Sequence, residues 1–218
     1  ISLRLRADVR DLEQVQAAVD RLRVHFGPIH GLVCAAGIQG PIGPLATADP
    51  AAWWDTLDTN VRGVMISMRA VLPGMCEQRS GKVIVLSGGG STRPRPGFSA
   101  YAASKTALVR LVETVAEEVV EFNVQVNAMA PGNAYTAITD EILRAGDRAS
   151  ADEQAQARQV RQSGGTPPAK QIELAAFLAS ERSNHISGKL IHVMDDWRKL
   201  ERGTVHPEIF TLRRVQKV

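Results

Sequence analysis

The sequence has few cysteines, few long apolar runs and almost no excess charge, and each shortage excludes a class of protein. Its two cysteines, Cys34 and Cys76, lie in apolar surroundings and do not form a pair with zinc-site spacing. The five histidines are scattered. We therefore expect free thiols, no metal site and a reducing, cytoplasmic environment. No apolar run approaches the roughly 18 residues that a membrane-spanning helix needs, so we expect no membrane segment.

The charge balance is close to even. Lys and Arg number 26 and Asp and Glu number 23, which leaves a net charge of +3. Nucleic-acid-binding proteins gather their basic residues in a stripe, so we expect no nucleic-acid partner. We assign residues 1–196 to one domain and residues 197–218 to a basic C-terminal tail, whose charged residues include Arg198, Lys199, Arg202, Arg213, Arg214 and Lys217.

What is present is a regular alternation of strand and helix patterns. Apolar runs at 29–36, 82–86, 124–128 and 189–194 predict buried strands. Apolar residues at helical spacing predict helices over 12–26, 50–75, 100–121 and 168–181. Residues 136–165 are polar and show no sustained period. The pattern predicts an α/β fold, a doubly wound parallel sheet that binds ligands at the carboxyl ends of its strands.

The sharpest local signal is Tyr101-Ala-Ala-Ser-Lys105. A tyrosine and a lysine four residues apart on a helix share one face. A free tyrosine has a pKa of about 10, and a nearby ammonium group favours the phenolate and lowers that pKa. The pair can therefore act as a proton-transfer device. On these residues alone, an ordinary amphipathic helix with a surface lysine remains the alternative.

Other motifs stand in a fixed order around this pair. Cys34-Ala-Ala-Gly37 ends a predicted strand, Thr59-Asn60-Val61-Arg62-Gly63 lies within a predicted helix, and Asn127-Ala-Met-Ala-Pro131-Gly132 ends another strand. With these motifs, about residues 3–194 resemble the short-chain dehydrogenase/reductase family. The resemblance implies a Rossmann-like oxidoreductase that moves a hydride between NAD or NADP and a small alcohol or carbonyl substrate. It also implies a homodimer or homotetramer.

The resemblance implies a role at each matching position. Tyr101 would be the general acid/base, Lys105 would lower its pKa and hold the nicotinamide ribose, and Asn60 would kink its helix and tie a water to the lysine. Without the resemblance, Asn60 could be a solvent-facing residue, and Asp8 could cap the helix that begins near Asp11. The positions that match the family's cofactor contacts are Asp8, Val9, Ala35, Ala36, Gly37, Tyr101, Lys105, Pro131, Gly132 and Thr136.

The sequence departs from the family pattern at three positions near the predicted site. Cys34 and Ala35 replace two family asparagines, so their side-chain hydrogen bonds are lost. The family serine that polarises the substrate oxygen would lie thirteen residues before Tyr101, where this chain has Gly88. We expect the neighbouring Ser87 to take that catalytic role, with Ser91 as the alternative. A plain glycine turn is the third interpretation.

The family's Gly-rich phosphate-binding turn does not occur in the sequence. The chain opens at Ile1, and Ser2 to Arg6 alternates like a strand already under way. The resemblance makes Ser2 to Ala7 the third strand of the sheet. We therefore expect an N-terminally truncated domain that lacks its first two βα units, on the order of 30 to 60 residues. Such a chain should be poorly stable alone and should bind the cofactor weakly.

Two other functions remain open. The first is a catalytically impaired nucleotide-binding or scaffold protein of the same fold, which Gly88 and Ala35 favour. The second is a relative of the nucleotide-sugar epimerases and dehydratases, which also use Tyr-x-x-x-Lys. The polar stretch 137–167 lies where the family varies its substrate lid, and nothing in it identifies a substrate.

Overall fold

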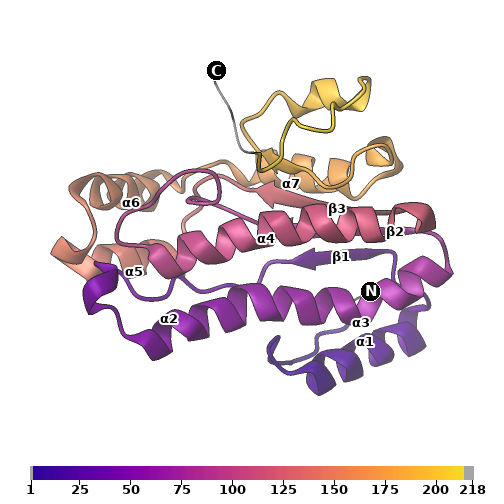
Figure 1. Cartoon of the computed structure of the whole chain (residues 1–218), viewed down its shortest axis with the longest axis horizontal. Coiled ribbons are helices and arrows are strands. Elements are labelled where there is room, and N and C mark those ends of the chain that lie inside the picture. The colour runs from indigo at the N-terminus through magenta and orange to yellow at the C-terminus, as the bar shows by residue number, and fades with distance from the viewer. Residues whose placement is uncertain (1, 214–218) are drawn as a thin grey trace.

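A computed structural model describes residues 2–213 and shows a parallel sheet at the centre of the chain (Figure 1). Its four strands are β1 (Gly31–Cys34), β2 (Gly81–Leu86), β3 (Val124–Ala130) and β4 (Leu190–His192), in that order across the sheet. Each strand overlaps one of the four predicted apolar runs, and β2 and β3 extend one and two residues beyond theirs. Because parallel strands need long crossovers, helices connect them, and the predicted α/β fold is confirmed.

The predicted helices are also confirmed, with one interruption. They are α1 (Leu12–Phe26), α2 (Pro50–Leu57), α3 (Gly63–Glu77), α4 (Ser99–Glu118) and α7 (Pro168–Leu178). The predicted helix over 50–75 is broken between α2 and α3 by a single π-helical turn, η2 (Asp58–Arg62). Short 3₁₀ turns make up the rest: η1 (Leu45–Thr47), η3 (Val120–Phe122), η4 (Gly146–Arg148), η5 (Glu181–Ser183) and η6 (Trp197–Glu201).

The region without a helical period nevertheless contains two helices, α5 (Ala137–Ala145) and α6 (Ala151–Ser163). Hydrogen bonds at their ends help to start them. Thr136 and Thr139 cap each other reciprocally at the start of α5, and the Ser150 side chain accepts from the Glu153 N–H at the start of α6. Each helix buries only two apolar residues, Ile142 and Ala145 in α5 and Ala157 and Val160 in α6, so neither gives a period long enough to stand out in a polar stretch.

The prediction of a strand over Ser2 to Ala7 is wrong. These residues alternate between exposed and half-buried, as the sequence pattern suggested, but they pair with no strand in the described chain. Alternation sets which side chains face inward, whereas a strand also needs a hydrogen-bonded neighbour. The alternative role of Asp8 as a helix cap is also wrong, because Asp11 caps α1 by accepting from the Glu13 and Gln14 N–H groups.

Two cores lie on opposite faces of the sheet. Val83 and Val85 of β2 face a core shared with α1, α3 and α4, whereas Ile84 between them faces a core formed with α7. Successive strand residues point to opposite faces, so β2 is buried on both sides, as a parallel strand requires. A third, smaller cluster joins Phe98 to α5 and α6.

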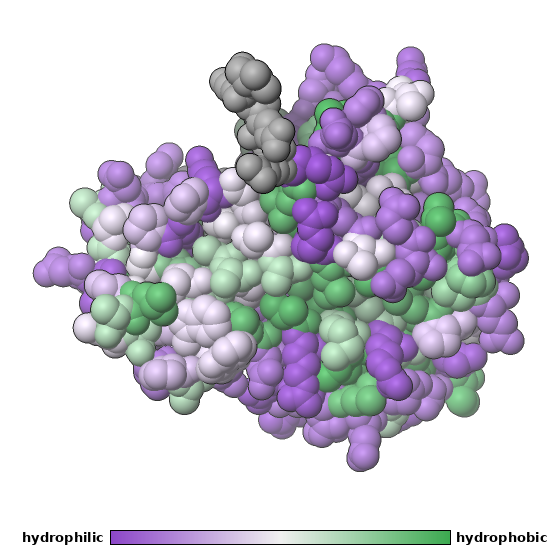
Figure 2. Space-filling view, in the orientation of Figure 1, coloured by the Kyte–Doolittle hydropathy of each residue, from purple (hydrophilic) through white to green (hydrophobic). Residues whose placement is uncertain are grey.

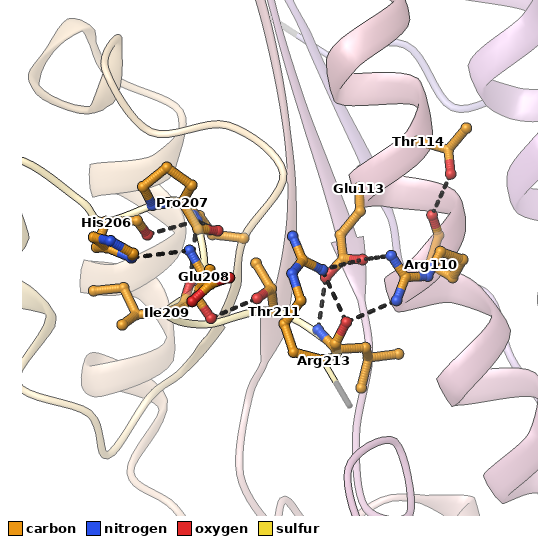
Figure 3. A network of polar contacts seen from close by, with 11 residues as sticks. Arg110, Glu113, Thr114, His206, Pro207, Glu208, Ile209, Thr211 and Arg213 are labelled. Atoms are coloured by element: carbon orange, nitrogen blue, oxygen red, sulfur yellow. Dashed lines mark hydrogen bonds and ion pairs between the residues drawn. The ribbon is translucent and has the colours of Figure 1, made fainter. Parts of the chain in front are cut away.

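The described part of the C-terminal tail folds back on this domain (Figure 3). The Lys189 ammonium donates to the main-chain carbonyls of His206, Pro207 and Ile209 at 2.7–3.1 Å. The Glu113 carboxylate of α4 accepts from the Leu212 N–H at 2.7 Å. Trp197 is buried in the core beneath α7. The division of the chain at residue 196 stays a prediction, and residues 214–218, with Arg214 and Lys217, lie outside the described residues.

None of the helices within residues 2–213 is long and apolar enough to cross a membrane. No group of three or more His, Cys, Asp and Glu side chains within the same residues is arranged to hold a metal ion.

Candidate active site

The predicted site residues follow the carboxyl ends of the strands. Ala35 to Gly37 follow β1, Ser87 and Gly88 follow β2, and Pro131 follows β3. The carboxyl ends of parallel strands meet at one edge of the sheet, which is where open α/β sheets bind ligands. Tyr101 and Lys105 lie in the first two turns of α4, which begins after the β2 loop.

Asn60 lies at the centre of the polar contacts. It is fully buried in the π-helical turn, and it is not a solvent-facing residue. Its Oδ1 accepts from the Ile38 N–H at 2.8 Å, and its Nδ2 donates to the Ile38 carbonyl at 2.9 Å and to Ser104 Oγ at 3.0 Å. Asn60 therefore ties the loop after β1 to α4. Single π-helical turns are frequent at functional sites.

Tyr101 and Lys105 face each other on α4. The Lys105 Nζ lies 5.4 Å from the centroid of the Tyr101 ring and donates to the Leu86 carbonyl at 2.9 Å. Burial lowers the pKa of Lys105 to about 8. Burial also raises the pKa of Tyr101, and the positive charge of Arg95 opposes that rise. That Lys105 itself lowers the Tyr101 pKa stays a prediction.

Gly37 lies against both Asn60 and Lys105. A Cβ atom at this position would lie 3.2 Å from Asn60 Oδ1 and 3.7 Å from Lys105 Nζ. Ala35, Ala36 and Gly37 are all exposed. The glycine therefore keeps an open surface beside the lysine ammonium, where a larger residue would crowd it.

Gly88, rather than either neighbouring serine, lies beside the Tyr101 hydroxyl. A Cβ atom on Gly88 would lie 3.2 Å from Tyr101 Oη. The Ser87 hydroxyl is buried against α4 and donates to the Lys105 carbonyl at 3.4 Å. Ser91 is buried too, and its main-chain N–H closes a turn onto the Gly88 carbonyl. The catalytic role of Ser87 stays a prediction, which its hydrogen bond to the main chain does not favour.

The remaining predicted cofactor contacts lie at the ends of other elements. Val9 packs against Gly63, where a Cβ atom would lie only 2.7 Å from the valine. The neighbouring Arg10 pairs with Asp8 at 2.8 Å and holds the pKa of that exposed carboxyl near 2. Gly132 has a φ of +74° and packs against Thr166, and Thr136 caps α5. A positive φ disfavours any residue but glycine at position 132.

Three residues near the site were not predicted from the sequence. Ser104 joins Asn60 to the main chain of Tyr101, because its hydroxyl donates to the Tyr101 carbonyl at 2.7 Å. The position of Ser104 directly before Lys105 was the sequence feature that could have identified it. Arg95 and Glu153 form an ion pair beside Tyr101, and they are too far apart in the sequence for any spacing rule to connect them.

Comparisons with known proteins show which family this chain resembles. A family model described as enoyl-(acyl carrier protein) reductase matches residues 2–195. Oxidoreductase UcpA of Salmonella typhimurium is 34% identical over 189 residues, which are 84% of this chain and 71% of the relative. The 2-(R)-hydroxypropyl-CoM dehydrogenase of Xanthobacter autotrophicus is 35% identical over 195 residues, 88% of this chain and 76% of the relative.

Solved structures show the same fold. A gluconate 5-dehydrogenase from Burkholderia cenocepacia, in complex with NADP and tartrate, superimposes with a TM-score of 0.75 at 27% identity, covering 89% of this chain and 74% of its own. An NAD⁺-bound xylitol dehydrogenase superimposes with a TM-score of 0.76 at 26% identity, covering 85% of this chain and 75% of its own. The parallel sheet and its flanking helices are therefore Rossmann-like.

Proposed function

The chain belongs to the short-chain dehydrogenase/reductase family, and from this premise we propose that it is an NAD(P)-dependent oxidoreductase acting on an alcohol or carbonyl group. Tyr101 is the general acid/base of the proposed reaction. The observation that carries the proposal is the buried Lys105 ammonium, 5.4 Å from the Tyr101 ring on a helix that Asn60 holds in place.

The residues at the sheet edge fit the nicotinamide end of such a cofactor. The exposed Ala35-Ala36-Gly37 segment leaves an open surface next to Lys105, which would hold the ribose hydroxyls. Pro131, Gly132 and Thr136 would contact the carboxamide, and Asp8 and Val9 the adenine. When bound, a nicotinamide cofactor supplies or accepts the hydride. The gluconate 5-dehydrogenase and xylitol dehydrogenase structures contain NADP and NAD⁺, which supports this cofactor class without choosing between the two.

The proton moves through Tyr101. In the oxidation direction, the phenolate oxygen takes the proton of the substrate hydroxyl, and in the reduction direction the phenol returns it. The nearby lysine ammonium stabilises the phenolate, because opposite charges attract strongly in a partly buried site. Asn60 is a positioning residue here: it fixes Ser104, which in turn holds the main chain of Tyr101.

The substrate oxygen has one donor fewer than in the family pattern. Gly88 offers no hydroxyl at the position beside Tyr101 Oη. Removing one donor from a developing oxyanion costs about 10²–10³ in rate. We therefore propose a slow enzyme, unless a substrate hydroxyl or a water fills this space.

A cofactor titration and one substitution test the proposal. Thermal melts with NADH and with NADPH identify the cofactor, because a ligand that binds the folded state raises the midpoint. Activity is then measured by nicotinamide absorbance with a panel of alcohols, polyols and their carbonyl partners. Tyr101→Phe should lower the rate by about 10²–10⁴ and keep most of the cofactor-induced shift, because it removes one hydroxyl and leaves the other predicted cofactor contacts in place. Full activity in Tyr101→Phe would overturn the assignment.

Gly88 also keeps the scaffold alternative open. A wild-type protein with a normal cofactor-induced shift but no activity across the whole panel would favour that alternative. In that case, Tyr101→Phe would also leave the protein's biological role intact.

We propose that the protein assembles through α3 and α4, which lie side by side on the face seen in Figure 2. Apolar residues form a band across the middle of this face (Figure 2), and Met65 is 41% exposed there. Met65→Asp should dissociate a dimer or tetramer in sedimentation experiments. Val24→Asp, on an exposed site of α1, is the matched control. The groove between the two helices is lined by Met65, Met68, Leu72, Pro73, Cys76, Leu111 and Val115.

A further inference from the structure

An ion pair lies beside Tyr101 and is formed by two residues that belong to none of the motifs named in the sequence analysis. Arg95, in the loop after β2, makes two hydrogen bonds of 2.7 Å to the carboxylate of Glu153 on α6. Both side chains are largely buried, at 16% and 19% exposure. Two parallel bonds between a guanidinium and a carboxylate fix the orientation of both groups. The pair therefore joins the active-site loop to a helix of the lid region.

Arg95 lies over aromatic rings as well as beside a carboxylate. Its guanidinium carbon is 4.0 Å from the centroid of Phe98, which is fully buried, and 5.5 Å from the centroid of Tyr101. The Lys105 Nζ lies at almost the same distance from the Tyr101 ring, 5.4 Å. Tyr101 therefore has two cations at equal range, of which only the lysine is expected from the Tyr-x-x-x-Lys pattern.

We propose that Arg95 is a second positioning cation for Tyr101 and that it stabilises the phenolate from the loop after β2. The negative charge of Glu153 partly offsets this stabilisation. The inference rests on the proposed role of Tyr101 as the proton-transfer residue. It places a positive charge on the same loop as Gly88, which lacks the hydroxyl of the family serine.

The charges around Tyr101 give this proposal a definite sign. Arg95 on the loop is positive and Glu153 on α6 is negative, whereas Lys105 on α4, whose pKa burial lowers to about 8, has lost its charge in the pH range where Tyr101 titrates. A positive charge favours the phenolate and a negative charge opposes it. Burial raises the pKa of Tyr101 and Arg95 lowers it. Removing Arg95 and removing Glu153 should therefore move the Tyr101 pKa in opposite directions.

The alternative is that the pair only fastens α6 to the loop. Replacing either Arg95 or Glu153 would then break the same contact between the loop and α6, and water would reach Tyr101. Because burial is what raises the Tyr101 pKa, both substitutions would lower it. The direction in which the Tyr101 pKa moves when Arg95 is replaced therefore distinguishes an electrostatic role of Arg95 from a purely structural one.

The chain allows this measurement without substrate or cofactor, because it contains only two tyrosines, Tyr101 and Tyr135. In a Tyr135→Phe background, the ultraviolet absorbance of tyrosinate reports Tyr101 alone. Arg95→Met should raise its pKa by about 1 unit, Glu153→Gln should lower it, and Arg95→Lys should keep it near the starting value. A fall in both Arg95→Met and Glu153→Gln, or no change in either, would overturn the proposal.

Arg182 supplies a matched control. It makes the same two-bonded pair with Glu201, at 2.6 and 2.7 Å, and its guanidinium lies 5.4 Å from the Phe177 ring. Arg182→Met should leave the Tyr101 titration unchanged. If Arg95→Met does not fold, as judged by circular dichroism, Arg95→Lys decides the outcome, because it keeps the positive charge and loses the two-bonded pairing: the Tyr101 pKa stays near its starting value under the proposal and falls under the alternative. Since no activity is measured, this result is independent of whether the proposed reaction is found.

Discussion

The two walls of the site are built differently. The inner wall, formed by Asn60, Tyr101, Ser104 and Lys105, comes from helical segments that pack on the sheet, and Asn60, Ser104 and Lys105 are buried. The outer wall, formed by Gly88, Arg95 and Glu153, comes from a loop and from α6, which packs on a small separate cluster. The inner wall matches the family pattern, whereas the outer wall departs from it.

This difference indicates which site residues are held in position by the main hydrophobic core. The proposed proton-transfer residues cannot move without disturbing helices that are packed against β1 to β3. The outer wall can change its residues at small cost, because few core contacts depend on it. We therefore expect substitutions in the inner wall to have larger effects than substitutions in the outer wall, and four predictions test that order.

The largest effect is expected for Lys105→Met. It removes the ammonium 5.4 Å from the Tyr101 ring while keeping a long side chain at a buried position. We expect the rate of hydride transfer to fall by about 10²–10³, within the range for losing proton-transfer assistance. Steady-state assays with the substrate found in the alcohol panel measure this. A rate within threefold of wild type would contradict the inner-wall assignment.

Lys82 is the control for that experiment. Burial lowers the pKa of both Lys82 and Lys105 to about 8, but Lys82 donates to Asn184, on the α7 side of the sheet. Between pH 8 and pH 10 each of these two lysines keeps its proton in the unfolded chain and loses it in the folded chain, so each contributes stability that rises with pH in this window. Lys105→Met should remove up to about 1.4 kcal/mol per pH unit of this slope. Lys82→Met should also flatten the slope, yet leave activity unchanged.

Asn60→Ala should cost both stability and activity. It leaves the Ile38 N–H and carbonyl without their partners and releases Ser104. Unsatisfied buried groups cost about 1–3 kcal/mol, which denaturant unfolding measures. Asn127→Ala is matched to it, because Asn127 is also buried and bonds to Ile186 and Lys189. Asn127→Ala should lose comparable stability and keep its activity. An equal loss of activity in both variants would show that Asn60 has no specific role in the site.

Gly88→Ser should raise the activity rather than lower it. Its Cβ atom would lie 3.2 Å from Tyr101 Oη, so the added hydroxyl would lie next to the group that acts on the substrate oxygen in the proposed reaction. We expect kcat to rise about tenfold, a conservative share of the 10²–10³ that one donor contributes. Gly88→Ala adds the same Cβ without the hydroxyl, and it should lower kcat by crowding Tyr101. Equal rates in the two variants would show that the hydroxyl has no role.

The two walls also differ in how well the sequence predicted them. Tyr101 and Lys105 are four residues apart on one helix, so a local rule finds them, and counting back from Tyr101 found Gly88. The Arg95–Glu153 pair joins residues 58 positions apart, and no local spacing encodes it. The strand predicted over Ser2 to Ala7 failed for a related reason, because alternation describes exposure but not the partner strand.

Ser87→Ala should have the smallest effect of the four. Sequence counting made Ser87 the catalytic serine, but its hydroxyl is buried and donates to the Lys105 carbonyl at 3.4 Å. A hydroxyl held by the main chain of α4 is poorly placed to donate to a substrate, so we expect kcat to change less than threefold. Ser91→Ala is the matched control, since Ser91 is buried at the other end of the same turn. A drop of about 10²–10³ in Ser87→Ala alone would show instead that the loop rearranges on substrate binding and that the outer wall, too, carries a catalytic donor.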